Sequence, residues 1–280
     1  MSEISVVKFG GRRELFGGFK LRRSLLKAGA SPEVADKVLE QAEKQIVSGM
    51  TTDEIYRRAF SILWHLARPA AVRYSLRRAI SDFGPTGFPF EDFVAELFRS
   101  LGFEAKTRVI LQGACVAHEV DVVAWNGEKL IMVEAKFHNS PGERTDQKVT
   151  LYVKARFDDL IEQVFQIGGR RRELTEGWLI TNTKFTLNAV RYGLCAGLKL
   201  LSWDYPEKDN LHRLIEEARL HPVTSLSSLS LAEKQRLLEN GVVLCRTILE
   251  LGADKLRRYG IPEAKVKPAV EEASLICRGG

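Results

Sequence analysis

The sequence predicts an α/β protein built around a mixed sheet, with a mostly helical segment before it and a small helical segment after it. The middle of the chain alternates helix and strand patterns in the order α-β-β-β-α-β-α-β, which is typical of an α/β layer. The first 80 and the last 59 residues have mainly helical patterns. The chain has 280 residues, of which 45% are hydrophobic and 28% charged, in the range of soluble globular proteins with two or three domains.

Several classes of protein are excluded or disfavoured by composition. No apolar stretch approaches the roughly 18 residues of a membrane span. Charged residues interrupt positions 1–13, where a signal peptide needs an apolar run. We therefore expect a cytoplasmic protein with no membrane partner. The four cysteines form no CxxC motif and the five histidines form no HxxxH or HExxH pair, so neither a redox motif nor a helical zinc site is supported.

The net charge of +6 is unevenly distributed. Residues 1–80 hold 15 Lys and Arg against 8 Asp and Glu, residues 81–221 hold 18 against 21, and residues 222–280 hold 9 against 7. The first segment therefore has a charge of +7, and the middle segment −3. Concentrated positive charge favours an anionic partner such as a polyphosphate or a nucleic acid. A merely solubilising surface is the alternative.

The first segment is expected to open with a strand over residues 4–8, a turn at Gly10-Gly11 and a return strand at 14–16. Ser31 is a natural N-cap with Pro32 at the first helical position. Thr51 or Thr52 is expected to cap the third helix, whose first turn contains two acidic residues. Residues 81–87 read as a linker. The helices are expected at residues 19–28, from 32 to about 48, from the Thr51 or Thr52 cap to 67, and at 72–80.

The middle segment is expected to begin with a helix that Gly102 ends. Asn126-Gly127 between two alternating apolar runs is a strong hairpin signal. Residues 139–150 are polar and are expected to form a mobile loop. The helices are expected at residues 89–101, 153–168 and 187–196, and the strands at 105–111, 119–125, 130–137, 178–181 and 198–203.

The hairpin carries the most specific chemistry. Side chains alternate between the faces of a strand, so Glu134 and Lys136 point the same way. A four-residue loop pairs Trp125 with Leu130 and places Asp121 directly opposite Glu134. A two-residue loop would keep all three charged residues on one face, whereas a three-residue loop would not.

Two opposed carboxylates about 5 Å apart repel by roughly 3 kcal/mol at an effective dielectric constant near 20. A divalent cation converts this repulsion into coordination, and Mg²⁺ prefers oxygen ligands. Lys136 could then position a water or stabilise developing phosphate charge. Glu119 lies on the same face and could replace one ligand. The opposite face is wholly apolar and is expected to be core, while a surface hairpin with scattered charge is the simpler alternative.

Asp121 followed by Glu134-Ala135-Lys136 resembles the PD-(D/E)xK nuclease signature. Leu101-Gly102-Phe103 and residues 178–186 are similar to the Mrr-like restriction endonuclease branch, and the resemblance covers about residues 88–205. It implies Mg²⁺- or Mn²⁺-dependent hydrolysis of DNA, with Asp121 and Glu134 as metal ligands and Lys136 serving the water. Glu91 stands where the family has a further acidic ligand. Gln163 falls in an expected helix where related nucleases often have a functional glutamine, and an ordinary polar residue at this position is an equal alternative.

The pattern Val6 to Glu14 resembles the start of an ATP-cone, a nucleotide-sensing domain, and this resemblance spans about residues 4–80. It implies that Lys8 and Lys20 contact phosphates, Glu14 contacts the nucleoside, and Thr52 binds at a helix N-terminus. Lysines and free helix N–H groups suit a polyphosphate. The resemblance implies ATP or dATP as a regulatory ligand and a homo-oligomer, dimer or higher. The alternative is a basic DNA-binding domain without nucleotide.

The last segment has glycines at its bends and resembles helix-hairpin-helix DNA-binding domains. Such hairpins present backbone amides to phosphates. A module for packing or dimerisation is an equal alternative.

These observations predict three domains, at residues 1–82, 88–221 and 222–280. The predicted function is an Mg²⁺-dependent DNA endonuclease regulated by ATP or dATP. Two alternatives remain open. One is a nucleotide-sensing regulator that binds DNA without cleaving it, and the other is a structure-selective junction resolvase.

Overall fold

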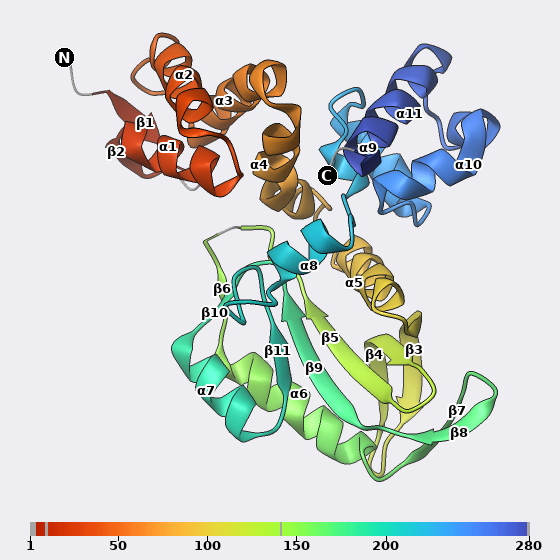
Figure 1. The fold of residues 1–280 in the computed structure, drawn as a ribbon. Helices are drawn as coiled ribbons and strands as arrows, with labels where there is room; N and C mark the ends of the chain where they lie inside the picture. The colour runs from red at the N-terminus through yellow and green to blue at the C-terminus, as the bar shows by residue number, and fades with distance from the viewer. Residues whose placement is uncertain (1–3, 9–10, 141, 279–280) are drawn as a thin grey trace. The chain divides into compact units, whose positions relative to one another are not determined.

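The computed structural model describes residues 4–8, 11–140 and 142–278. The chain divides into two compact units, of which the first ends at Arg77 and the second runs from Arg78 to Arg278 (Figure 1). The second unit contains both the middle and the last segment expected from sequence. Within the described residues, none of the helices is both long and apolar enough to cross a membrane.

The first unit begins with an antiparallel pair of short strands and continues with helices. Val6 of the first strand pairs with Glu14 of the second. The expected turn at Gly10-Gly11 lies partly outside the described residues. Apolar side chains of all four helices form one buried core, with Leu25, Val38 and Leu63 fully buried. The elements are β1 (Ser5–Val7), β2 (Arg13–Leu15), α1 (Gly18–Lys27), α2 (Pro32–Glu43), α3 (Thr52–Leu66) and α4 (Arg68–Ser81), which crosses the boundary between the units.

Capping side chains set where these helices begin. The Ser31 hydroxyl accepts a hydrogen bond from the Val34 N–H, as its sequence context predicts. Thr51 and Glu54 form a reciprocal capping box. Thr51 is therefore the cap, and Thr52 is the first helical residue.

The second unit is built on a five-stranded mixed sheet in the order β11-β9-β5-β4-β3. The pairs β3–β4 and β4–β5 are antiparallel, and β5–β9 and β9–β11 are parallel. This arrangement confirms the expected mixed α/β architecture. The strands are β3 (Glu104–Gln112), β4 (Ala117–Trp125), β5 (Leu130–Lys136), β9 (Glu176–Thr181) and β11 (Lys199–Leu201).

Helices cover both faces of this sheet (Figure 1). On one face lies α5 (Phe88–Ser100), whose Phe98 ring packs edge-on against Trp178 of β9 at 5.6 Å between centroids. On the other lie α6 (Gln147–Leu160) and α7 (Leu187–Cys195). Their apolar side chains share a core with strand residues such as Met132. Both faces of the central hairpin are therefore core, whereas the sequence predicts this for one.

The region between β5 and β9 differs most from the sequence prediction. The expected loop at 139–150 contains β6 (Arg144–Thr145), which pairs with β10 (Lys184–Phe185), and the first residues of α6. The Asp146 side chain caps α6 by accepting from two backbone N–H groups. The expected helix at 153–168 is wrong beyond Leu160, because the chain turns there into a hairpin, β7 (Val164–Ile167) and β8 (Arg170–Glu173).

The last part of the second unit is helical, as expected. Gly252 has φ 74° and kinks α10, a conformation that glycine adopts without steric cost. The elements are α8 (Leu211–Glu217), the 3₁₀ turn η1 (Val223–Ser225), α9 (Leu231–Glu239), α10 (Cys245–Arg258) and α11 (Glu263–Arg278).

Candidate active site

Asp121 and Glu134 lie on neighbouring strands where the central hairpin opens. The register expected from the sequence is confirmed for four pairs, the last of which is Val122 with Val133. The ladder stops there, one pair before the two acidic residues. Asp121 Oδ2 instead accepts a hydrogen bond from the backbone N–H of Ala135 at 2.8 Å. This bond fixes the Asp121 carboxylate beside the strand that carries Glu134.

The charge of Asp121 disfavours the ionised form of Glu134. Burial raises the pKa of Glu134 to about 7, and the negative charge of Asp121 adds to this rise, while Arg156 and Lys136 oppose it. Burial also raises the pKa of Asp121, against the hydrogen bond from Ala135 and the charge of Arg156. Such shifts are expected where buried like charges meet and where an active site holds them in place.

Arg156 of α6 is a site residue that the sequence analysis missed. Its Nη1 donates to Glu134 Oε2, and its Nη2 donates to the backbone carbonyl of Glu119. Its side chain is 8% exposed. One sequence signal could have revealed it: Arg156 lies three residues after Val153, on the side of the helix that the apolar residues mark as core.

Glu91 approaches the site from α5, on the other side of the sheet. Burial and the charge of Asp121 raise the pKa of Glu91, while Arg108 lowers it. Arg108 Nη1 lies 3.0 Å from Glu91 Oε2, and Arg108 Nη2 lies 2.8 Å from Asp92 Oδ1. Glu91 therefore lies within electrostatic reach of Asp121 but is held by an arginine.

Arg108 has an unusual backbone conformation next to the site. Its φ is +54°, in the left-handed region that L side chains rarely adopt. The β3–β4 ladder pairs Thr107 with Val122 and Val109 with Val120 but omits the pair between them. The omitted residues are Arg108 and Asp121. The backbone around Asp121 is thus released from ladder pairing toward both of its neighbouring strands.

Lys136 is the last residue of β5 and lies two positions after Glu134 on the same face. It forms neither an ion pair nor a side-chain hydrogen bond with any residue that the structure describes. The strand is held just beyond it, because the His138 N–H donates to Asn182 Oδ1 at 2.8 Å and Asn182 Nδ2 donates to the His138 carbonyl at 2.9 Å. The ammonium group is therefore available on a well-anchored strand.

Among the described contacts, the side chain of Gln163 makes no hydrogen bond to Asp121 or Glu134. The prediction that it lies in a helix is wrong, because α6 ends at Leu160 and Gln163 lies in the turn before β7. It is seven residues beyond Arg156, the α6 residue that reaches Glu134. The side chain that α6 contributes is consequently an arginine, not this glutamine.

The donor set fits a divalent cation in its chemistry. Asp121 and Glu134 offer carboxylate oxygens, the ligands that Mg²⁺ prefers, and their mutual repulsion would be relieved by positive charge. Glu91 does not complete a set of three, since the described residues contain no group of three His, Cys, Asp or Glu side chains placed to hold a metal. The residues that fit the cation are therefore the opposed pair.

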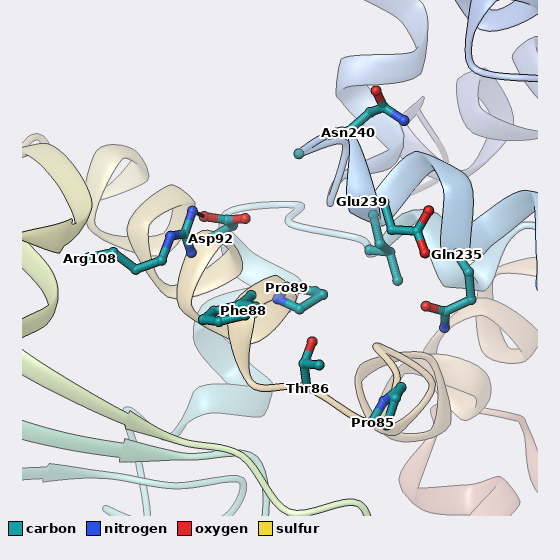
Figure 2. A pocket seen from close by; sticks show the side chains of 11 residues that line it. Pro85, Thr86, Phe88, Pro89, Asp92, Arg108, Gln235, Glu239 and Asn240 are labelled. Carbon is teal, nitrogen blue, oxygen red and sulfur yellow. Dashed lines mark hydrogen bonds and ion pairs between the residues drawn. The ribbon is translucent and has the colours of Figure 1, made fainter.

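A cavity of about 580 Å³ lies beside this site, between the start of α5, β3 and the end of α9. Figure 2 shows Arg108 and Asp92 on one side of it and Gln235 and Glu239 on the other. The Arg108 guanidinium also lies 5.5 Å from the centroid of the Phe88 ring. These side chains bring no excess of positive charge, so the cavity does not suit a phosphate.

The residues expected to bind nucleotide lie in the first unit. Lys8 Nζ is 2.6 Å from Glu14 Oε2, and Lys20 Nζ is 3.4 Å from Glu14 Oε1. The hydrogen bond from Lys8 is the largest cause that lowers the pKa of Glu14. Thr52 opens α3. The structure thus brings Lys8, Glu14 and Lys20 together at the exposed surface.

Comparisons with known proteins match two segments of the chain. Residues 85–205 match the restriction endonuclease family Mrr, which confirms the Mrr-like resemblance. Residues 221–277 match the family described as AF1548-like, C-terminal. No ATP-cone is found among these matches.

Similar proteins include an uncharacterized protein of Archaeoglobus fulgidus, 38% identical over 183 residues, which are 65% of this chain and 99% of the relative. The crystal structure of the protein of unknown function AF1548 is 37% identical and covers 70% of this chain and 100% of its own, with a TM-score of 0.58. The MspJI restriction endonuclease in complex with a 27-mer oligonucleotide is 15% identical, covering 61% of this chain and 36% of its own, with a TM-score of 0.36.

The first of these relatives is matched over nearly its whole length, while about a third of this chain lies outside the match. Together with the restriction-endonuclease sheet and the matched last segment, this similarity settles the family. The chain belongs to the AF1548-like proteins, and in it a restriction-endonuclease segment is followed by an AF1548-like C-terminal segment.

Proposed function

We propose that this protein is a metal-dependent DNA endonuclease. The observation that carries the proposal is the pair of largely buried carboxylates, Asp121 and Glu134, with raised pKa values on adjacent strands of a restriction-endonuclease-like sheet. Lys136 follows on the same face. The domains would be those expected from sequence, residues 1–82, 88–221 and 222–280.

Asp121 and Glu134 would hold Mg²⁺ or Mn²⁺, which would supply positive charge for the scissile phosphate and acidify a bound water. Lys136 would orient the attacking water or donate a hydrogen bond to a phosphate oxygen. Arg156 keeps the Glu134 carboxylate in place. Glu91 would assist the pair electrostatically or through a water.

The test is cleavage of supercoiled plasmid by the full chain. Nicked or linear product should form with Mg²⁺ or Mn²⁺ and not with EDTA. Lys136→Ala should remove activity by a factor of 100 or more, as losses of single catalytic groups do. Lys199→Ala, which removes an exposed lysine from β11 of the same sheet, should not.

The same assay separates the rival functions. A wild-type chain that binds DNA but never cleaves it would be the DNA-binding regulator. A chain that cleaves four-way junctions and leaves plain duplexes intact would be the junction resolvase. Equal cleavage by wild type and Lys136→Ala would refute the site.

We also propose that the first unit binds ATP or dATP as a regulatory ligand. The convergence of Lys8 and Lys20 on Glu14 supports this, because two ammonium groups at one place suit a polyphosphate. The strand pair followed by four helices agrees with the ATP-cone resemblance. Nucleotide would act by changing the association of subunits, so a homo-oligomer belongs to the proposal.

A further inference from the structure

The β7–β8 hairpin is a small two-stranded ribbon separate from the main sheet. Its four residue pairs run from Val164↔Glu173 at the root to Ile167↔Arg170 at the tip. Gly168 and Gly169 form the turn with φ values of 59° and 74°. Two positive φ values are typical of the tight type I′ turn, whose twist matches that of the strands. The ribbon is therefore short, regular and closed at its tip.

Side chains on one face anchor the ribbon to the nuclease domain. Phe165 is 8% exposed and belongs to the core under α6. Arg172 Nη1 donates to the Asn126 carbonyl at 2.5 Å, and its Nε donates to the Ile167 carbonyl at 3.2 Å. A Cβ at Gly168 would lie 2.3 Å from Trp125 Nε1, so the β7–β8 turn packs against the end of β4 in the central β4–β5 hairpin. The ribbon is thus held rigidly.

The opposite face presents polar groups to solvent. Gln166 and Arg171 are directly paired across the ribbon, and both are exposed. Arg170 pairs with Ile167 and so lies on the same face as Phe165 and Arg172, but it is exposed beside the turn. Neither Arg170 nor Arg171 has an ion-pair partner in the described parts of the chain. Two free guanidinium groups and an amide therefore project from a rigid arm.

The arm lies within one turn of duplex DNA from the carboxylate pair. It leads into β9, whose first residue Glu176 pairs with Ile131, three residues before Glu134. At about 3.3 Å per residue this is roughly 10 Å along the sheet, and the four pairs of the ribbon add about 13 Å. One turn of B-DNA spans about 34 Å. Figure 1 shows the ribbon extending from the sheet beside β4.

We propose that the β7–β8 ribbon is a DNA-contacting arm that enters the major groove of the duplex, which rests on the proposed function. The major groove is wide enough for a two-stranded ribbon. Arg171 and Gln166 face the base edges, where arginine pairs with guanine and glutamine with adenine. Arg170 contacts a phosphate. The deep, narrow major groove of duplex RNA does not admit such an arm.

The experiment measures binding of the full chain to a 25-base-pair DNA duplex in EDTA by fluorescence anisotropy, across a range of salt concentrations. Arg170→Ala with Arg171→Ala should weaken binding at least tenfold and lower the slope of log K against log salt by about 0.9, since Arg170 makes one phosphate contact and each such contact contributes about 0.9. Arg191→Ala removes an exposed arginine from α7 and should leave affinity and slope within twofold of wild type. Melting temperatures should match, because among the described residues neither Arg170 nor Arg171 has an ion-pair or hydrogen-bond partner for its side chain.

Unchanged affinity and slope in the double variant would overturn the inference, and so would an equal loss in Arg191→Ala. An equal loss on duplex RNA of the same sequence would also overturn it, since charge alone would then explain the effect. Failure of the two proposals can be told apart. If the wild type never cleaves DNA but needs Arg170 and Arg171 to bind it, the DNA-contacting arm stands and the nuclease proposal is refuted. If the wild type cleaves DNA and the double variant cleaves it equally well, the nuclease proposal stands and the DNA-contacting arm is refuted.

Discussion

Arg156 of α6 donates to Glu134 of β5 and, with its second terminal nitrogen, to the main chain of β4. Both side chains are mostly buried, at 8% and 16% exposed. One guanidinium thus joins the helix to the two strands that carry the candidate catalytic carboxylates. It also reduces the repulsion between these carboxylates, since its charge opposes the rise in pKa of both.

We predict that Arg156→Met destabilises the protein by about 3–5 kcal/mol, because it leaves the Glu134 carboxylate buried without its partner. Urea unfolding in EDTA measures this. Arg156→Met combined with Glu134→Gln should cost less than the sum of the two single changes. Arg191→Met, on the exposed face of α7, should leave the free energy of unfolding within about 0.5 kcal/mol of the wild-type value. Additive costs in the double variant would show that the two residues do not depend on each other.

Asp121→Asn should raise the stability of the metal-free protein by about 1–3 kcal/mol near pH 8, because it removes the repulsion on Glu134 while the Asn oxygen can still accept from Ala135. The effect should depend on pH. The pKa of Glu134 rises from 4.5 to about 7 on folding, so this group stabilises the fold below pH 4.5 and that contribution is lost as the pH rises through 7. The gain should therefore be smaller at pH 5 than at pH 8.

Melting temperatures of the two proteins in EDTA at both pH values check this. Excess Mg²⁺ should then stabilise the wild type more than Asp121→Asn, since it binds the intact pair. A variant that melts below the wild type at pH 8 in EDTA would contradict the opposed arrangement of the carboxylates.

Arg108→Gly should be more stable than Arg108→Ala by about 1 kcal/mol. Both changes remove the ion pairs to Glu91 and Asp92, so these contacts cancel in the comparison. Only the glycine adopts the φ of +54° without steric cost. The same pair of changes at Lys106, two residues earlier in β3 and without a positive φ, should favour alanine. Chemical denaturation of the four variants is the measurement, and a preference for alanine at both positions would refute backbone strain at Arg108.

The carboxylate hairpin could be predicted from the sequence because its information is local. The alternation of residues 120–125 and 130–135 predicts the faces, and Asn126-Gly127 predicts a hairpin; of the loop lengths left open by the sequence, the structure has the four-residue loop that pairs Trp125 with Leu130. The covering helix α5 was also expected, at residues 89–101 with Gly102 at its end, and the structure places it at Phe88–Ser100. Two errors around α6 have local causes. The cap at Asp146 lies in a polar stretch that resembles a loop, and the strand Arg170–Glu173 is too polar to show an apolar alternation.

Arg108 and Arg156 escaped prediction for a different reason. Their acidic partners lie 17 and 22 residues away in the chain, and only the packing of helices on the sheet brings them together. A basic residue in a helix or a strand usually marks a solvated surface, so its type alone carries no sign of a buried ion pair. Such partners follow from tertiary structure and not from local pattern.

The final prediction concerns nucleotide binding by the first unit. Lys8→Ala with Lys20→Ala should abolish binding of ATP and dATP measured by calorimetry, because both ammonium groups that meet at Glu14 are removed. Lys27→Ala with Lys37→Ala removes two exposed lysines from the same unit and the same charge, and should retain binding.

If nucleotide regulates the nuclease, it must bind two states of the protein with different affinity, and a coupling of about 1–3 kcal/mol would alter activity 5–150-fold. Plasmid cleavage and sedimentation should then respond to nucleotide in the wild type and in Lys27→Ala with Lys37→Ala. In Lys8→Ala with Lys20→Ala, neither plasmid cleavage nor sedimentation should change when nucleotide is added. A wild type that binds neither nucleotide would refute regulation, and the excess of positive charge in residues 1–80 would then favour a contact with the DNA backbone instead.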